Sequence, residues 1–306
     1  MANLQCVQVQ TTSVCNARCT ICPYKDSWFI KNPGYMSDEL YVKILDDIAD
    51  YDPIFFGKFC PYLCNEPLAD KNIVQRLDLA RQKLANPYLE VSTNLALATR
   101  NQIDDLIRVF ERNGFNGRIM VSFHGTNEES YRKTMGISYE KAMCNAIYLI
   151  GQFDSRLPIY LHCATVSRDG LYSLTTDDEF RKFWEKIVVL RNLKFKNLFL
   201  YPLKFHTRAG NVNLDEWKYK KIVRDIGPDN RFDCPRIHNH LHVIYTGEVI
   251  GCCCDYQHEV ILGDLTKQSI KEVFNSDKWK NWVKMVTGEI ESPPDFLCKR
   301  CSWVGG

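Results

Sequence analysis

The sequence predicts an α/β fold in which a parallel sheet curves into an open or partial barrel and a small, cysteine-rich α+β module follows it. Strand-like runs alternate with helix-like runs from residue 7 to residue 201, and strict alternation is typical of a parallel sheet with helices packed on it. Three of the 14 cysteines stand directly after the first strand-like run. Six more come after residue 230.

Each strand of the barrel is expected where β-branched or apolar residues cluster. These runs are residues 7–12, 54–60, 89–92, 118–123, 159–163 and 198–201. Helices are expected between them, at residues 38–51, 73–84, 102–112, 139–153 and 179–190. Ser37 stands at the start of the first helix, where its side chain can accept a hydrogen bond from a free backbone N–H. Six strands are too few for a complete eight-stranded barrel, so we expect the sheet to stay open.

The composition is that of an ordinary globular protein of 306 residues, with 45% hydrophobic and 25% charged residues. This length predicts one large domain, or a large one and a small one. No apolar run reaches membrane length, and the N-terminal residues do not form a secretory signal. We therefore expect a cytoplasmic protein whose cysteines are metal ligands, reactive thiols or core residues. A net charge of +2 without a long run of one sign gives no footprint for nucleic acid or a membrane.

The most informative stretch is the loop after the first strand, which carries Cys15, Cys19 and Cys22 in a C-x3-C-x2-C pattern. This spacing lets one turn of chain direct three thiolates at one soft metal centre. Three ligands are one fewer than a closed structural site uses, so one position on the metal stays open for exchange. The alternative is that the three are simply buried core residues.

This loop resembles the signature of the radical S-adenosylmethionine (SAM) superfamily. The resemblance implies a partial (β/α)6 barrel, similar to a TIM barrel, and a 4Fe–4S cluster held by the three cysteines. In that family SAM binds the open iron, and an electron from the cluster cleaves it to methionine and a 5'-deoxyadenosyl radical that abstracts a hydrogen atom. The residue before the last cysteine is often aromatic in the family and is Ile21 here.

Polar residues that follow the other strands are the candidates for binding SAM. Glu66 stands in a segment that resembles the family's Gly-Glu-Pro, with asparagine in place of glycine, and the resemblance implies that it binds the SAM amino group. Asn94 lies in a stretch similar to Thr-Asn-Gly, and Ser122 ends the fourth strand. Arg208 lies in a segment that resembles Asn-Arg-Ala-Gly, with threonine for asparagine. Helix capping or loop hydrogen bonds are the alternative roles for these residues.

The remaining cysteines follow a polar stretch at residues 211–230. Two strands and a helix are expected among them, at residues 242–245, 249–250 and 268–286. Gly247 separates the two strands and predicts a β-hairpin. Four cysteines are spaced so that the fold could bring them around one metal centre: Cys234, Cys252, Cys298 and Cys301.

This spacing resembles the auxiliary-cluster fold of radical SAM enzymes in its short form, the twitch domain, of which the SPASM domain is the fuller form. The resemblance implies an auxiliary 4Fe–4S cluster held by these four cysteines, and a four-cysteine zinc site is the alternative. We expect three parts: a radical SAM barrel over residues 1–210, a linker over residues 211–230 and a twitch-type domain over residues 231–306.

Cys253 and Cys254 are left over when Cys252 is taken as a cluster ligand. In one interpretation they are buried thiols. In the other, one of them is catalytic and donates a hydrogen atom to a substrate radical, because an S–H bond is weak enough to quench a carbon radical. A cysteine beside an auxiliary-cluster ligand does this in radical epimerases of the superfamily.

The sequence thus leaves three functions open. The preferred hypothesis is an epimerase that inverts a C–H centre of a sugar, an aminoglycoside-like compound or a peptide. The second is a dehydrogenase that oxidises an alcohol or amine through the auxiliary cluster, and the third is a non-catalytic metal-cluster scaffold. The chain begins almost at the first strand, so we expect a polar small molecule rather than a leader-bearing peptide. A one-electron reductant such as flavodoxin or ferredoxin is the expected partner.

Overall fold

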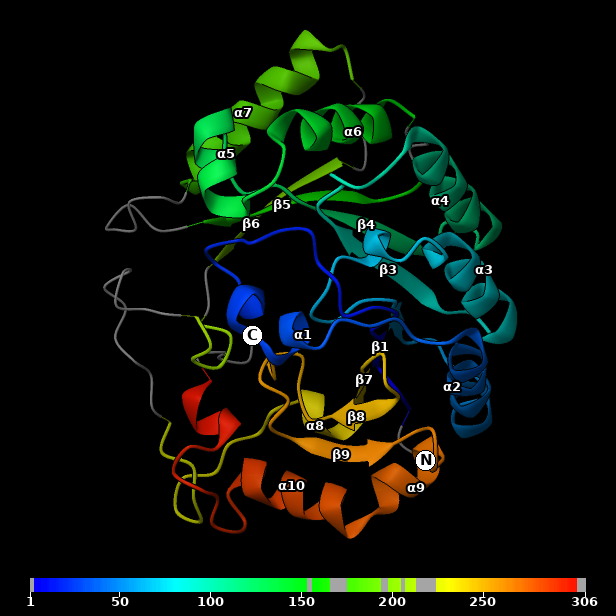
Figure 1. Cartoon of the computed structure of the whole chain (residues 1–306), viewed down its shortest axis with the longest axis vertical. Helices are drawn as coiled ribbons and strands as arrows, with labels where there is room; N and C mark the ends of the chain where they lie inside the picture. The colour runs from blue at the N-terminus through cyan, green and yellow to red at the C-terminus, as the bar shows by residue number, and fades with distance from the viewer. Residues whose placement is uncertain are drawn as a thin grey trace.

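A single curved sheet runs through the molecule and joins its N-terminal and C-terminal parts (Figure 1). The computed structural model describes residues 3–152, 156–165, 175–193, 198–204, 207–212 and 224–301. Within these residues the sheet has the strand order β6-β5-β4-β3-β2-β1-β7-β8-β9.

The first six strands are parallel and neighbour one another in chain order, as expected for a partial barrel. They are β1 (Cys6–Val9), β2 (Lys58–Cys60), β3 (Tyr88–Thr93), β4 (Gly117–Ser122), β5 (Ile159–Thr165) and β6 (Leu198–Lys204). The helices are α1 (Trp28–Lys31), α2 (Asp38–Tyr51), α3 (Ile73–Lys83), α4 (Arg100–Arg112), α5 (Glu128–Met135), α6 (Tyr139–Gly151) and α7 (Asp177–Leu190). Except for α1, they lie on the outer side of the sheet (Figure 1). The α/β class and the partial barrel are therefore confirmed.

Two details of the barrel depart from the sequence predictions, and one agrees. The Ser37 side chain accepts a hydrogen bond from the Leu40 N–H and caps α2, as predicted. The strand expected from residue 54 begins only at Lys58, because the chain turns after Asp52 and leaves Ile54 56% and Phe56 63% exposed. Helix α5 was not expected, since its eight residues are mostly polar.

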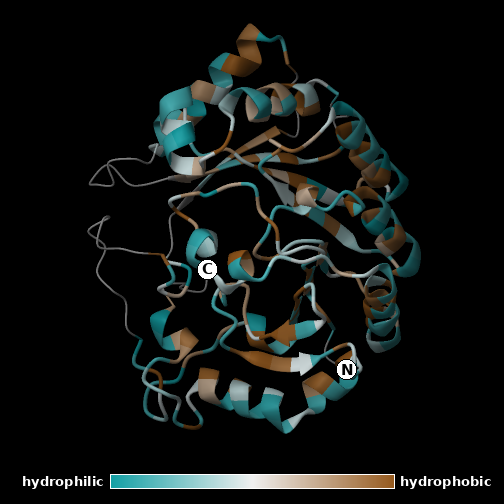
Figure 2. Cartoon of the chain, in the orientation of Figure 1, coloured by the Kyte–Doolittle hydropathy of each residue, from teal (hydrophilic) through white to brown (hydrophobic). Residues whose placement is uncertain are grey.

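The two faces of the sheet have opposite character, because successive side chains of a strand point to opposite sides. The outer face, under the helices, carries the apolar residues Val7, Val9, Phe59, Leu89, Val91, Ile119, Val121, Ile159 and Leu161. The inner face carries the polar residues Gln8, Gln10, Glu90, Arg118, Ser122, His162 and His242. Figure 2 shows that the strands and helices each carry both hydrophobic and hydrophilic residues.

The C-terminal part continues the barrel sheet. Strand β7 (His240–Val243) pairs with β1 in parallel, and β8 (Glu248–Ile250) and β9 (Ile261–Asp264) follow in antiparallel order. The predicted hairpin is therefore present as β7 and β8, with Gly247 at a φ of +94° in its turn. Its first strand also supplies the second neighbour of β1, which the sequence did not predict.

The helix expected at residues 268–286 is in fact two helices, α9 (Ile270–Asn275) and α10 (Asp277–Thr287). Ser276 separates them, because its backbone is extended and its side chain accepts a hydrogen bond from the Trp279 N–H at the start of α10. The short helix α8 (Arg236–Asn239) precedes β7. None of the helices in the described ranges combines the length and apolarity that crossing a bilayer requires.

Most of the linker predicted at 211–230 lies outside the described residues, as do residues 302–306 of the predicted twitch-type domain. The division into three parts therefore stays a prediction.

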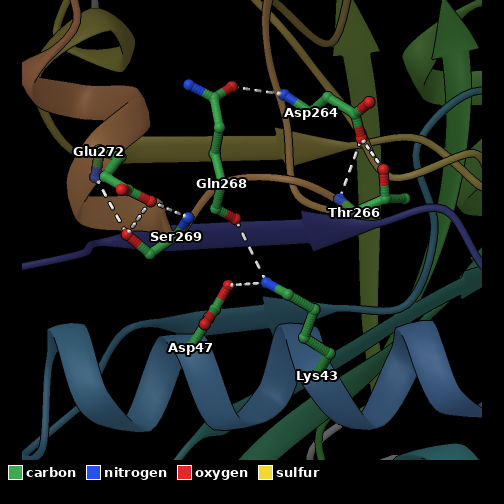
Figure 3. Close-up of polar contacts among 7 residues, drawn as sticks. All are labelled: Lys43, Asp47, Asp264, Thr266, Gln268, Ser269 and Glu272. Carbon is green, nitrogen blue, oxygen red and sulfur yellow. Dashed lines mark hydrogen bonds and ion pairs between the residues drawn. The ribbon is translucent and has the colours of Figure 1, made fainter.

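One polar contact ties α2 of the barrel to the C-terminal part (Figure 3). The Lys43 ammonium donates to the Asp47 carboxylate at 2.6 Å and to the Gln268 carbonyl at 3.2 Å. Directly after Gln268, Ser269 and Glu272 form a reciprocal capping box that starts α9. The start of α9 is thus fixed both by its own cap and by the barrel.

We predict that Ser269→Ala lowers the free energy of unfolding by about 1 kcal/mol, because the α9 cap loses its accepting oxygen. Urea denaturation followed by circular dichroism measures the change. Ser269→Asp keeps an acceptor at the same position and should retain most of the stability. Equal destabilisation by alanine and aspartate would show that the cap is not the source of the effect.

Candidate active site

The loop after β1 holds three buried or half-buried thiols, those of Cys15, Cys19 and Cys22. The Tyr24 hydroxyl fixes its start, since it accepts from the Cys15 N–H and donates to the Ser13 carbonyl, both at 2.9 Å. The loop is also bound to the end of α5, where the Arg18 N–H donates to a backbone carbonyl at 3.1 Å. The sequence therefore positions the three thiols on a loop that is anchored at its start and in its middle.

Burial and mutual repulsion make these thiols unfavourable as free thiolates. Burial, with the nearby Glu66 carboxylate, raises the pKa of Cys15 to about 12. Burial and the charges of Cys22 and Cys15 raise the pKa of Cys19 well above its ordinary value. A positively charged soft metal centre would reverse both effects, because it binds the thiolate form. Three sulfur donors without a closing fourth on the same loop fit an iron–sulfur cluster with an open iron.

Glu66 is a buried carboxylate, 3% exposed, with no cationic partner among the described residues. It accepts hydrogen bonds from the Thr93 hydroxyl at 2.6 Å, the Asn94 N–H at 2.8 Å and the Leu68 N–H at 3.1 Å. Burial raises its pKa to about 7, although these hydrogen bonds act in the opposite direction. A buried acid beside the cysteine loop without a countercharge fits a ligand that brings N–H donors, as the amino group of SAM does.

Asn94 and Ser122 are both occupied by contacts within the chain. The Asn94 amide donates to the Asn16 side chain and accepts from the Ala96 N–H, each at 2.9 Å, and so joins the end of β3 to the cysteine loop. The Ser122 hydroxyl lies 2.7 Å from Nε2 of His162. Their predicted role in SAM binding stays a prediction. Both lie at the carboxyl ends of strands, where barrel sites form.

Arg208 lies between the cysteine loop and the C-terminal part. Burial alone would lower its pKa, but the Tyr256 phenol and the thiols of Cys254 and Cys22 raise it overall. The guanidinium therefore stays charged in a region crowded with sulfur. Its backbone adopts a φ of +49°, which places the side chain on a tight turn that begins at Thr207. The charge of Arg208 thus interacts with thiols of both groups of cysteines that the sequence predicted.

Three consecutive cysteines of the C-terminal part lie close together. The sulfur atoms of Cys252, Cys253 and Cys254 lie within 4.8 Å of one another. Burial raises the pKa of Cys298, and the thiols of Cys234, Cys301 and Cys254 raise it further. The charges of Cys234, Cys298 and Cys301 therefore influence one another, and soft sulfur donors of this kind fit an iron–sulfur cluster. The ligand set of Cys234, Cys252, Cys298 and Cys301 stays a prediction.

The surplus thiols differ in their surroundings. The Arg236 guanidinium donates to the Cys253 sulfur at 3.3 Å, and the Cys64 thiol donates to the Cys253 carbonyl at 3.8 Å. Hydrogen bonds from Cys252 and Cys254, together with Arg236, hold the pKa of Cys253 well below its ordinary value. Cys254 is 2% exposed and packs against Ala209 and Leu297.

Sequence reasoning missed the polar groups that line the inner face of the sheet. Both amide atoms of Gln10, Nδ1 of His162 and Nε2 of His242 are buried and have no hydrogen-bond partner in the described part of the chain. Unpaired buried polar atoms are rare, and a bound ligand is one way to satisfy them. The signal was available in principle, since Gln8 and Gln10 alternate with Val7 and Val9 in the first strand.

Glu90 is a second feature that the sequence did not reveal. This inner-face carboxylate accepts from the Tyr62 hydroxyl and the Arg118 guanidinium, both at 2.5 Å, and pairs with Lys58 at 3.3 Å. Burial opposes its ionisation, but Lys58, Tyr62 and Arg118 lower its pKa overall. The sequence signal for this network was the charged Glu90 between Leu89 and Val91 of β3, since buried charges are usually paired.

Comparison with known proteins covers both groups of cysteines. A model of the radical SAM superfamily matches residues 9–154, and a model of the SPASM iron–sulfur cluster-binding domain matches residues 234–302. The S-adenosyl-L-methionine-dependent 2-deoxy-scyllo-inosamine dehydrogenase of Niallia circulans is 20% identical over 298 residues, which cover 97% of this chain and 92% of the relative.

Solved structures show the same fold. BtrN in complex with AdoMet and 2-DOIA superimposes with a TM-score of 0.62 at 17% identity, covering 98% of this chain and 94% of BtrN. The anSMEcpe enzyme with bound AdoMet gives a TM-score of 0.55 at 15% identity, covering 92% of this chain and 83% of anSMEcpe. Streptococcus suis SuiB bound to precursor peptide SuiA gives a TM-score of 0.58 at 10% identity, covering 98% of this chain and 71% of SuiB. The two matched domains make SAM and 4Fe–4S clusters the cofactors.

We predict that the two groups of cysteines load separately. Wild-type protein reconstituted without oxygen should hold about eight irons per chain, as two 4Fe–4S clusters. Cys15→Ala should lose about half of the iron and all reductive cleavage of SAM. Cys234→Ala should lose a similar amount but keep some cleavage. Loss of zinc rather than iron from Cys234→Ala, or release of 5'-deoxyadenosine by a Cys15, Cys19 and Cys22 triple alanine variant, would contradict the assignment.

A second prediction concerns Glu66. Glu66→Gln should weaken SAM binding about 10- to 100-fold, since it removes a charge-assisted hydrogen bond of about 1.5–3 kcal/mol. The carboxyl accepts hydrogen bonds from the SAM amino group most strongly when it is ionised, so wild-type affinity should rise as the pH rises through about 7, and this dependence should vanish in Glu66→Gln. Thr93→Val removes a hydrogen bond that favours the ionised form of Glu66, so the rise in SAM affinity should move to higher pH. Equilibrium binding measures each effect, and a pH-independent wild-type affinity would contradict the prediction.

Proposed function

We propose that this radical SAM enzyme, which carries a C-terminal iron–sulfur domain of the SPASM/twitch type, oxidises a secondary alcohol or amine of a small polar substrate. The observation that carries the proposal is the similarity to a dehydrogenase over nearly the full length of both chains. That relative acts on 2-deoxy-scyllo-inosamine. We therefore drop the third hypothesis, a non-catalytic metal-cluster scaffold, because the matched domains are those of an enzyme.

The inner face of the sheet supports a polar substrate. Gln10 can donate and accept through one side chain, and the imidazoles of His162 and His242 each keep one unpaired nitrogen. Gln10 directly follows β1, and His162 and His242 lie on β5 and β7, so polar groups along the inner face can meet a ring that carries several hydroxyl or amino groups. Burial and the charge of Arg208 lower the pKa of His162 to about 4. Its ring is therefore neutral at physiological pH and can accept as well as donate.

When bound, SAM and the two clusters would supply a hydrogen-abstracting radical at one centre and an electron acceptor at the other. Glu66 would accept hydrogen bonds from the amino group of SAM. Phe29 and Ile244, which are fully buried beside Cys15 and Cys22, exclude water from the first centre. Oxidation removes one hydrogen atom, one proton and one electron from the substrate, so the product is lighter by two hydrogens.

Epimerisation is the second candidate, and the surplus thiols favour it. Cys253 or Cys254 would then donate a hydrogen atom to the substrate radical. Two contacts argue against this role. The Arg236 guanidinium on the Cys253 sulfur favours a thiolate, which has no hydrogen atom to give, and Cys254 is packed against Leu297. We therefore place oxidation first, which reverses the order that the sequence suggested.

Incubation with 2-deoxy-scyllo-inosamine and related aminocyclitols in deuterium oxide separates the two reactions. We predict a product lighter by two hydrogens, with no solvent deuterium at the oxidised carbon and with one 5'-deoxyadenosine formed per turnover. Cys254→Ala should turn over, because no thiol donates to the substrate. A product of unchanged formula that carries one deuterium, together with loss of product in Cys253→Ala, would identify an epimerase instead. Mass spectrometry of substrate and product distinguishes these outcomes.

A further inference from the structure

We infer that Tyr256, a residue of the C-terminal part, raises the reduction potential of the cluster at Cys15, Cys19 and Cys22 through a hydrogen bond to the Cys22 sulfur. The inference rests on the assignment of that cluster. It does not depend on which substrate is oxidised.

The contact joins two parts of the chain that are far apart in sequence. The Tyr256 hydroxyl lies 3.7 Å from the Cys22 sulfur, within hydrogen-bond reach for a sulfur atom. The backbone of Tyr256 is hydrogen-bonded both to the N-terminal part and to the C-terminal part of the chain. Its carbonyl accepts from the Trp28 N–H, and its N–H donates to the Cys254 carbonyl, each at 3.0 Å. The phenol is therefore held in place by both the N-terminal and the C-terminal part.

The surroundings of this contact are apolar. Tyr256 is 5% exposed and lies in a buried cluster with Tyr24, Phe29, Cys64, Ile244 and Ile250, against which Cys15 and Cys22 pack. A hydrogen bond is electrostatically stronger in such a region than in water. The phenol has an ordinary pKa of about 10, so it donates its proton once Cys22 is a metal-bound thiolate.

The direction of the effect follows from charge. Reduction adds one electron to the cluster and its thiolates, and a hydrogen bond to a ligand sulfur stabilises the more negative state. Removing the hydroxyl should therefore make the cluster harder to reduce. Arg208, whose charge lies near both Tyr256 and Cys22, acts in the same direction but has other contacts as well. Tyr256 is the cleaner probe, because only its hydroxyl needs to be removed.

The test is a redox titration of reconstituted Tyr256→Phe, followed by electron paramagnetic resonance without substrate. The signal that changes on addition of SAM belongs to the first cluster. We expect its midpoint to fall, so that at the wild-type midpoint the ratio of reduced to oxidised cluster drops about tenfold, which equals 59 mV for one electron. The other cluster should keep its potential, and iron content should not change.

Tyr245→Phe is the matched control. Tyr245 also reaches from the C-terminal part to the N-terminal part, but its hydroxyl donates to the Asn32 carbonyl at 3.0 Å rather than to a thiol. Its removal should leave both midpoints unchanged. An unchanged midpoint in Tyr256→Phe, or an equal shift in Tyr245→Phe, would overturn the inference, since the second result would mean that loosening of the interface sets the potential.

Should Tyr256→Phe fold poorly, 3-fluorotyrosine at position 256 provides a second measurement. It keeps the shape of the side chain and donates a stronger hydrogen bond, so the midpoint should rise. A midpoint that stays constant or falls would contradict the inference. Since no substrate is present in either titration, an error in the proposed reaction would not affect the result.

Discussion

Burial of acidic groups is the constraint on which the site depends. Glu66 and the thiols of Cys15 and Cys19 lie in the protein interior, and burial disfavours their ionised forms. Without a bound cluster the two thiols therefore stay protonated, which avoids the cost of burying their charge. A positively charged cluster core would bind them as thiolates, and the sulfonium of SAM would add positive charge near Glu66. The cofactors thus complete the charge balance of the interior as well as supplying the chemistry.

The same region shows why the two ends of the chain act together. Cys64 lies on the loop after β2, and its thiol is close to Cys22 on one side and to Cys253 on the other. Tyr256 and Arg208 approach Cys22 from the C-terminal part. Each group of cysteines is therefore partly enclosed by residues that belong to the other. An oxidation that begins at one centre and delivers an electron to the second needs such proximity.

The sequence predicted the repeating part of the structure well and the unique part poorly. Periodicity located α2 and its Ser37 cap, because helix formation there is a local matter. Spacing predicted a ligand set of four cysteines, whereas the sulfur atoms that the structure brings within 4.8 Å of one another are those of Cys252, Cys253 and Cys254. The pairing of β7 with β1 could not be predicted, because it joins residues more than 200 positions apart and no local pattern encodes such a partner. The break at Ser276 was missed, since the apolar spacing continues through it.

The insertion of β7 beside β1 has a consequence for the newly made chain. Strand β1 emerges from the ribosome first, yet one of its two neighbours is made only when Val243 appears. At ordinary rates of translation this interval is on the order of 10–50 s. During that time β1 presents an unpaired edge, and such edges invite association with other strands. Nascent chains of this protein are therefore exposed to misassembly until late in synthesis, and a chaperone that shields the first strand would have most effect in that interval.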